Sequence, residues 1–256
     1  MITVDAIYIA PVKSLALVQP ETVHVGPTGI LEDRRLHLID GEGALLTQRQ
    51  VGPLVRVKAQ YQQEPERLAL HFPDGNGLDG PLELGDPVVT NMWGRDVPGR
   101  VVEGDWAASL SDFCGLPVRL VQSDLPCQCY DEYPMSLMSQ ASIDYLGRQF
   151  GDAPKSPTFD GRRFRPNFLL TGCEPHQEDD WLGGIIRVGS ELLVQVVARD
   201  PRCAITTHSP DTGERDADTL RLILNYRPNP RAPYFGVYGV VVRPGAVSLG
   251  DHVVTP

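Results

Sequence analysis

The amino-acid sequence predicts a mainly β fold of the α+β class, with many short strands and a few short helices. Glycine and proline, with 25 and 23 residues, make up about a fifth of the 256 residues, a share above the average for globular proteins. Apolar and polar residues alternate through much of the chain, and this alternation is typical of strands that bury one face. Frequent turns and a period of two both favour strands over long helices.

Alternating segments fill most of the first hundred residues. The turn-forming sequence Gly41–Gly43 separates two of them, and a second, Asp74–Gly77, follows another. Segments joined by short glycine-containing turns are expected to pair as hairpins. We predict strands at residues 2–9, 34–40, 44–49, 54–62 and 67–72.

Helical spacing of apolar residues occurs in three short segments. Asp105 can cap the first segment, which runs to Phe113, because a carboxylate accepts hydrogen bonds from the free N–H groups of a first turn. The other two helices are predicted at residues 139–150 and 217–226. Strands are expected between and after these helices at residues 116–122, 168–172, 185–189, 191–198, 235–242 and 247–254.

The least compact part of the sequence is Gln122–Tyr133, in which polar residues surround Pro126 and two cysteines. Such stretches commonly separate domains. We therefore predict two domains, a β-rich one at residues 1–122 and a second at 123–256, in which a few short helices cover the openings of a β structure.

Charge and hydropathy exclude several classes of function. A net charge of −10 and a pI near 5.0 disfavour nucleic-acid binding, which depends on clustered cations. No apolar run reaches the length of a membrane span, and Met1 precedes a strand pattern rather than a signal peptide. Five irregularly spaced cysteines indicate reduced thiols rather than a disulfide framework. We expect a cytoplasmic protein without a membrane or nucleic-acid partner.

Cys203 has a sequence context that allows two interpretations. It follows a long apolar strand, so its side chain can face a cleft at the strand end, and Arg202 beside it would favour the thiolate. A free cysteine is, however, more often a small buried apolar residue. A nucleophilic arrangement with His208 and Asp211 is a further alternative, although both lie in a predicted turn.

Cationic residues cluster in four separate segments of this acidic chain. They lie around Lys13–Ser14, Arg34–Arg35, Arg49 and Arg162–Asn167. Arginine and lysine bind phosphate, and serine and asparagine add neutral hydrogen bonds. Each segment alone would suggest solvated charges, but together they suggest an anionic ligand.

Other polar motifs give weaker signals. Cys127 and Cys129 are separated by one residue, which is too close for the usual zinc-binding pair. Asp131 and the run Glu178–Asp180 are expected to face solvent, as isolated or clustered carboxylates usually do.

A set of motifs in a fixed order gives the chain a specific resemblance. The motifs are IYIAPVKS, LEDRRLHLID, LTQRQ, YPMSLMSQAS, RFRPNFLLTG, EDDWLGGIIRVG, RCAITTHSPDTGE and GAVSLGDHV. Over nearly its whole length the chain resembles the MOSC superfamily with its N-terminal companion domain. Within that superfamily it is most similar to the mitochondrial amidoxime-reducing component and its bacterial counterparts.

This resemblance implies a MOSC-type β-barrel core and a molybdopterin-type molybdenum cofactor held between two domains. It also implies reduction of N-hydroxylated small molecules. By the same resemblance Cys203 is the metal ligand, and Asp131 lies near the open side of the metal, where it can hydrogen-bond a water or relay protons. The residues assigned to the cofactor are Lys13, Ser14, Arg34, Arg49, Arg165, Asn167, Arg202 and Thr206.

The sequence departs from its relatives in two respects. Asp200–Pro201 stands where many relatives have a cysteine or small residues, and Pro201 lacks an N–H donor. The chain also lacks the cysteine spacing of a plant-type ferredoxin, so electrons are expected from a separate ferredoxin-like or cytochrome-like protein.

Two other functions follow from family descriptions. In one, the protein is a non-catalytic carrier of the cofactor or of sulfur. The other is pyridoxal-phosphate binding, which needs a Schiff-base lysine. The candidates for that lysine are Lys13, Lys58 and Lys155, and Lys13 fits the phosphate role better.

Overall fold

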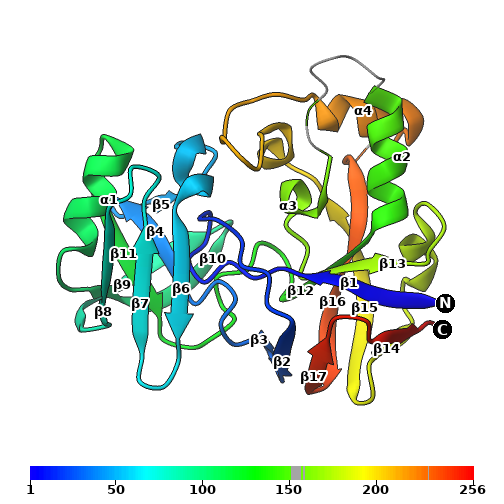
Figure 1. The fold of residues 1–256 in the computed structure, drawn as a ribbon, viewed down its shortest axis with the longest axis horizontal. Coiled ribbons are helices and arrows are strands. Elements are labelled where there is room, and N and C mark those ends of the chain that lie inside the picture. Colours follow the sequence, from blue (N-terminus) through cyan, green and yellow to red (C-terminus); the bar gives the residue numbers. More distant parts are fainter. Residues whose placement is uncertain (151–156, 158, 230) are drawn as a thin grey trace.

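Two lobes, each built on β-sheet, lie side by side along the long axis of the molecule (Figure 1). The computed structural model describes residues 1–150, 157, 159–229 and 231–256. Strands dominate both lobes and the helices are short, so the predicted mainly β fold class is confirmed. Among the described residues, no helix has the length and apolar character needed to cross a membrane.

A closed barrel forms the centre of the larger lobe. Neighbouring strands are antiparallel except β12 and β13, which run parallel. Inward-facing residues such as Val194 and Val196 are fully buried, as the alternating pattern predicts. In spatial order the strands are β1 (Ile2–Ile7), β13 (Phe168–Thr171), β12 (Met135–Ser139), β16 (Tyr234–Arg243), β15 (Leu192–Pro201), β14 (Ile185–Val188) and β18 (His252–Val254).

The smaller lobe contains a five-stranded antiparallel sheet and a three-stranded one. Leucines on the strands, including Leu38, Leu68 and Leu120, form its buried core. The larger sheet runs β5 (Leu45–Leu46), β4 (Leu36–Asp40), β11 (Val118–Ser123), β10 (Arg95–Val102) and β9 (Leu84–Met92), and the smaller runs β6 (Lys58–Gln62), β7 (Arg67–His71) and β8 (Gly77–Pro81).

The N-terminal segment does not stay in the lobe that the rest of the first half builds. β1 closes the barrel by pairing with β13 and β18. A further small sheet, β17 (Gly245–Ser248), β2 (Thr22–Gly26) and β3 (Gly29–Ile30), joins the two ends of the chain. β1 and β2 therefore pair with strands of the second half of the sequence, and the two halves interleave.

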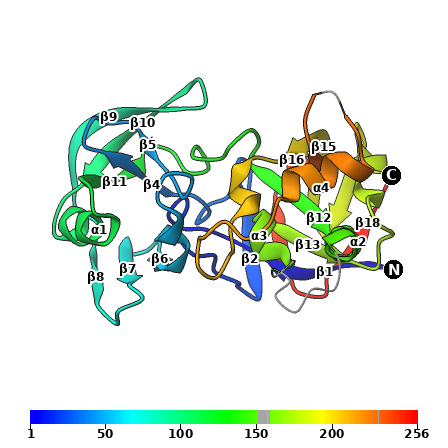
Figure 2. The ribbon, with the colours of Figure 1, turned by 90° about the horizontal axis from the view of Figure 1, so that it is seen from above.

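The helices lie outside the sheets, as the view from above shows (Figure 2). Helix α1 has Asp105 at its N-cap position, but the carboxylate makes no capping hydrogen bond, so the predicted side-chain cap is wrong. The helices are α1 (Trp106–Cys114), α2 (Gln140–Phe150), α3 (Gly161–Phe164) and α4 (Thr219–Tyr226), with 3-10 turns η1 (Gly52–Arg56), η2 (Gln177–Trp181) and η3 (Ala204–Thr207).

Three predicted strands differ clearly from the expectation. The one at 247–254 is split into β17 and β18, which belong to different sheets. The segment at 44–49 is a strand only at Leu45–Leu46, because Gln50 accepts hydrogen bonds from the Thr47 backbone and hydroxyl and closes a turn. The segment at 54–62 begins as η1, with Pro53 in its first turn, a position that favours helical geometry.

Candidate functional site

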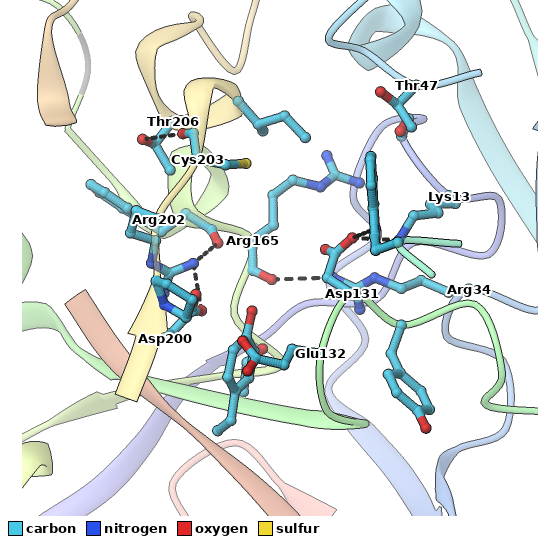
Figure 3. Close-up of a pocket in the computed structure, with 18 of the residues that line it drawn as sticks. Lys13, Arg34, Thr47, Asp131, Glu132, Arg165, Asp200, Arg202, Cys203 and Thr206 are labelled. Atoms are coloured by element: carbon cyan, nitrogen blue, oxygen red, sulfur yellow. Dashed lines mark hydrogen bonds and ion pairs between the residues drawn. The ribbon is translucent and has the colours of Figure 1, made fainter. Parts of the chain in front are cut away.

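A cavity of about 430 Å³ lies where the two lobes meet (Figure 3). Its walls come from the turn after β1, the turns around β4 and β5, the segment between β11 and β12, and the ends of β15 and α3. All ten residues singled out from the sequence line it: Lys13, Ser14, Arg34, Arg49, Asp131, Arg165, Asn167, Arg202, Cys203 and Thr206.

Cys203 stands at the end of β15, and its sulfur points into the cavity (Figure 3). The strand ends at Pro201, and η3 begins one residue after Cys203. Thr206 fixes this turn, because its backbone N–H and its hydroxyl both donate to the Cys203 carbonyl oxygen, at 3.2 and 3.1 Å. The Thr206 hydroxyl also shares a hydrogen bond of 2.7 Å with Thr219 on α4. Thr206 therefore fixes the backbone that carries the Cys203 side chain.

Arg202 makes its contacts away from the Cys203 sulfur. Its guanidinium pairs with Asp200 at 2.7 Å and donates to the carbonyl oxygens of Phe164 and Phe235 at 2.9 and 2.6 Å. These contacts brace the end of β15 against two neighbouring segments. None of the hydrogen bonds of the described residues joins Arg202 to the Cys203 sulfur.

Asp200 is a buried acid to which the sequence alone assigns no role in the site. Burial raises the pKa of Asp200 to about 6, although the charge of Arg202 and a hydrogen bond from Tyr238 oppose the rise. Both Asp200 and Tyr238 line the cavity. Asp200 is therefore a group that can hold or release a proton near neutral pH, three residues from Cys203.

Lys13 and Asp131 form the charged pair on the opposite side of the cavity. Lys13 Nζ donates to Asp131 Oδ1 and to the Cys129 carbonyl oxygen, both at 2.8 Å. Burial alone would raise the pKa of Asp131, but the charges of Lys13 and Arg34 outweigh burial and hold it well below its usual range. Asp131 therefore stays ionised at neutral pH, which favours an electrostatic role over proton transfer.

Arg34 and Arg165 bring two further cations to the same cavity. Arg34 is paired with Asp33, whereas Arg165 donates to the Leu15 carbonyl oxygen at 2.8 Å and has no carboxylate partner among the described residues. Burial, with the nearby charge of Arg34, lowers the pKa of Arg165 to about 10. An anion in the cavity would relieve this repulsion.

Asn167 has little capacity left for a ligand. Its Oδ1 accepts from the Ser136 backbone N–H and hydroxyl, and its Nδ2 donates to Asp33 and to the Tyr8 carbonyl oxygen. The side chain is 1% exposed. Direct cofactor binding by this amide would break existing bonds, so Asn167 is a brace that holds Asp33, and through it Arg34, in place.

Ser14 and Arg49 are the last two of the site residues predicted from the sequence. Ser14 has a φ of 75°, a strained conformation for a residue other than glycine, in the turn that carries Lys13. Arg49 stacks on the indole of Trp93 at 4.3 Å, and the indole N–H donates to Asp131 at 3.0 Å. This stack forms the outer wall of the cavity.

Several lining residues were not predicted, including Gln48, Trp93 and Tyr238. Gln48 lies in the LTQRQ motif, but only its charged neighbour Arg49 has a sequence signal for anion binding. Trp93 is at the tip of the β9–β10 hairpin, and no periodic pattern distinguishes it from any other turn residue. Tyr238 occupies a strand position and has no local signal for a site.

The alternative catalytic and metal-binding sets are not assembled. His208 and Asp211 line a different cavity from Cys203. The described residues contain no His, Cys, Asp and Glu cluster able to hold a metal ion, and Cys127 and Cys129 are buried. The Glu178–Asp180 run is not the expected solvated face, because Glu178 is fully buried and hydrogen-bonded to Ser142.

The lysines considered for pyridoxal phosphate lie in different places. Lys13 is engaged by Asp131, and Lys58 is an exposed residue of a second cavity. Lys155 lies outside the described residues.

Comparison with known proteins places the chain in a family. The MOSC N-terminal beta barrel domain matches residues 1–117, and the MOSC domain matches residues 114–254. "Mitochondrial amidoxime reducing component 2" of Macaca fascicularis is 31% identical over an alignment of 286 positions, which covers 98% of this chain and 82% of that protein. The human protein of the same name is 30% identical with the same coverage.

A third relative matches this chain over a smaller part of its own length. "Molybdenum cofactor sulfurase" of Anopheles gambiae is 27% identical over 244 residues, which cover 83% of this chain and 31% of that protein. The family models and the full-length relatives confirm the resemblance inferred from the ordered motifs. The chain belongs to the MOSC domain family and carries the MOSC N-terminal beta barrel domain ahead of its MOSC domain.

Proposed function

We propose that this protein reduces N-hydroxylated small molecules with a molybdenum cofactor bound in the cavity between the lobes. One observation carries the proposal: the cavity brings the Cys203 thiol together with three cations, Lys13, Arg34 and Arg165. The names of the full-length relatives, amidoxime reducing components, support the substrate class.

The donor set fits a cofactor that combines a soft metal with a phosphate. Thiolate sulfur is a ligand for soft transition metals, and Arg165 is a partly buried cation without a described carboxylate partner. Arg202 Nη2 is a further buried donor without a partner among the described residues. Cys203 would hold the metal, and Lys13, Ser14, Arg34 and Arg165 would hold the anionic end.

The supporting residues keep these groups in place before any ligand binds. Thr206 fixes the backbone at Cys203, and Asn167 fixes Asp33, which pairs with Arg34. Asp131 fixes Lys13 and compensates its buried charge. Such preorganisation means that little rearrangement is needed when the ligand enters.

When bound, the molybdenum cofactor supplies the two-electron redox chemistry that removes oxygen from an N–OH group. Asp200, with its pKa raised to about 6, is placed to hold a proton on the Cys203 side of the cavity. Asp131, ionised on the other side, contributes negative charge. We assign proton transfer to Asp200 and electrostatic positioning to Asp131.

Electrons would come from a separate ferredoxin-like or cytochrome-like protein. We propose that this exchange takes place in the cytoplasm, which the sequence predicts. A donor protein that reduces the loaded enzyme in a stopped-flow experiment would identify the partner.

Metal content tests the ligand assignment. The wild type and Cys203→Ser would be purified from a host that makes the cofactor, and molybdenum per chain would be measured by mass spectrometry. We expect the substitution to lower the ratio by roughly tenfold or more. Cys173→Ser is the matched control, since Cys173 is also a partly buried thiol but lies outside the cavity. Equal molybdenum in wild type and Cys203→Ser would reject Cys203 as the ligand.

The carrier function is the second candidate, and the sulfurase relative supports it. Reduction of benzamidoxime by the loaded protein, with an artificial electron donor, separates the two. A reductase forms benzamidine in repeated turnovers, whereas a carrier binds molybdenum and forms none.

A further inference from the structure

A second cavity, of about 560 Å³, lies at the same junction of the lobes. It shares Gln48, Arg165 and Ile205 with the first cavity. Its remaining walls come from the segment after β1, from η1 and β6, and from the loop that follows η3. The two cavities are therefore neighbours that meet across three side chains.

The charged residues of the second cavity are mostly cations. Arg162 is neutralised by Asp160 and Asp211, each at 2.7 Å. Arg163 pairs with Asp216 at 2.8 Å.

Two further cations of this cavity have no such neutralisation. Arg56 and Lys58 are exposed, and their side chains have no described ion-pair or hydrogen-bond partner. Burial lowers the pKa of His208, so this side chain adds no charge at neutral pH. A protein with a net charge of −10 thus presents an excess of positive charge to this cavity.

Part of the remaining wall is apolar. Ala16, Leu17, Val18, Ala59 and Pro73 provide hydrocarbon surface next to the cations. A ligand that matches both features has an apolar body and an anionic group. Inorganic anions alone would leave the apolar wall uncovered.

At the junction between the cavities, Gln48 offers an acceptor that is not used. The residue is 4% exposed, and its Oε1 has no partner among the described residues. A buried acceptor without a donor is costly, and an N–H group of a ligand that reaches the junction would satisfy it. Amidoximes carry such an N–H group next to the N–O bond.

We propose that the second cavity binds the carboxylate or phosphate tail of an N-hydroxylated substrate, whose N–OH end passes Gln48 into the first cavity. The inference deepens the proposed function and rests on it. Arg56 and Lys58 are the residues that select the anionic tail. The natural substrate is thus an anionic amidoxime or hydroxylamine rather than a neutral one.

Substrate selectivity tests this inference. The kcat/KM values for 4-carboxybenzamidoxime, 4-phosphonobenzamidoxime and neutral benzamidoxime would be measured in wild type, in Arg56→Gln/Lys58→Gln and in Arg56→Gln alone. We expect the wild type to prefer at least one anionic compound, and the double variant to lower the ratio of anionic to neutral kcat/KM by roughly tenfold. The compound with the higher kcat/KM identifies the anionic group that the cavity prefers.

Arg221→Gln is the matched control. Arg221 is an exposed arginine on α4, outside both cavities, and its loss changes the net charge by the same amount as Arg56→Gln. The ratio should stay at the wild-type value. If the ratio of anionic to neutral kcat/KM falls as much in Arg221→Gln as in Arg56→Gln, net charge alone explains the effect and the proposal is overturned.

Binding of a product analogue separates this inference from the proposed function. Calorimetry with 4-carboxybenzamidine needs no turnover and can use the protein with or without molybdenum. Binding that weakens in the double variant supports the cavity assignment even if no amidoxime is reduced. Conversely, reduction of benzamidoxime with no preference for either anionic compound leaves the reductase function standing and overturns the tail site. Equal losses for all substrates, together with a higher KM for the electron donor, would assign the cations to a protein partner and also overturn it.

Discussion

Lys13 Nζ donates a hydrogen bond of 2.8 Å to Asp131 Oδ1, across 118 residues of sequence. The lysine follows the first barrel strand, and the aspartate lies in the segment between β11 and β12. Burial lowers the pKa of Lys13, and Asp131 opposes that change. The pair keeps a buried ammonium group charged in the wall of the cavity.

Loss of the carboxylate should therefore destabilise the protein. We expect Asp131→Asn to lower the free energy of unfolding by about 2 kcal/mol, less than for a fully buried pair because the Asp131 side chain is 48% exposed. Urea denaturation measures the change. In Lys13→Met the same Asp131→Asn substitution should have a much smaller effect, and full additivity of the two would contradict the pairing.

Trp93 provides an optical probe of the cavity mouth. It is 48% exposed, whereas the other two tryptophans, Trp106 and Trp181, are 5% and 3% exposed. We expect Trp93→Phe to remove most of the acrylamide-quenchable fluorescence, because the buried indoles are shielded from the quencher. Trp181→Phe is the control and should leave quenching of the remaining emission strong.

His37 predicts how stability depends on pH. Burial, with the charge of Lys13 adding to it, lowers the pKa of His37 from 6.5 to about 3. Between these values the unfolded chain binds a proton that the folded protein does not bind. The free energy of unfolding should therefore fall as pH drops from about 6.5 towards 3, with His37 contributing about 1 kcal/mol per pH unit.

The substitution His37→Gln isolates this contribution. Urea denaturation of both proteins between pH 5 and 7 gives the difference in slope, whatever the change in stability at pH 7. Parallel lines for the two proteins would show that His37 takes up its proton in the folded state.

Gly213 and Gly52 bring the backbones of the two lobes together. A Cβ atom at Gly213 would lie 2.0 Å from the Gly52 carbonyl oxygen, and Gly213 has a φ of +77°. We expect Gly213→Ala to lower the free energy of unfolding by about 3 kcal/mol. Gly75→Ala separates the two causes, since Gly75 has a φ of +92° with nothing within 4 Å of the added atom, and should cost only about 1 kcal/mol.

Two substitutions test whether the Thr206 hydroxyl positions Cys203, one that removes the hydroxyl and one that keeps it. Thr206→Val keeps the shape but removes the hydroxyl that bonds the Cys203 carbonyl and Thr219. We expect a loss of about 2 kcal/mol in unfolding free energy and a changed rate of Cys203 alkylation. Thr206→Ser keeps the hydroxyl and should retain the wild-type alkylation rate. Identical rates in Val, Ser and Thr proteins would mean that Thr206 does not position the thiol.

The sequence predicts those parts of the fold that depend on local patterns of apolar residues. The helices predicted at 139–150 and 217–226 are observed at Gln140–Phe150 and Thr219–Tyr226, since their apolar spacing is read locally. The pairing of β1 with β13 and β18 could not be predicted, because it joins residues far apart in the sequence. A contiguous division at residue 122 therefore misses that the first strand belongs to the barrel.

The candidate site was predicted through charge and motif order rather than geometry. Lys13, Arg34 and Arg165 are distinctive because they lie in clustered cationic segments of a chain whose net charge is −10. The contacts of each residue were not predictable: Arg202 binds Asp200 rather than the sulfur, and Asn167 is occupied by Ser136 and Asp33. Such assignments depend on which neighbours the fold brings near, and sequence order does not contain that information.

The pairing of β1 with β18 also has a consequence for synthesis of the chain. On the ribosome β1 is made long before its partners β13 and β18, which begin at Phe168 and His252. Until those residues emerge, the apolar face of β1 and both of its hydrogen-bonding edges have no partner strand. An unpaired strand of this kind invites pairing with other chains. The barrel can therefore close only after β18 has been synthesised and has paired with β1.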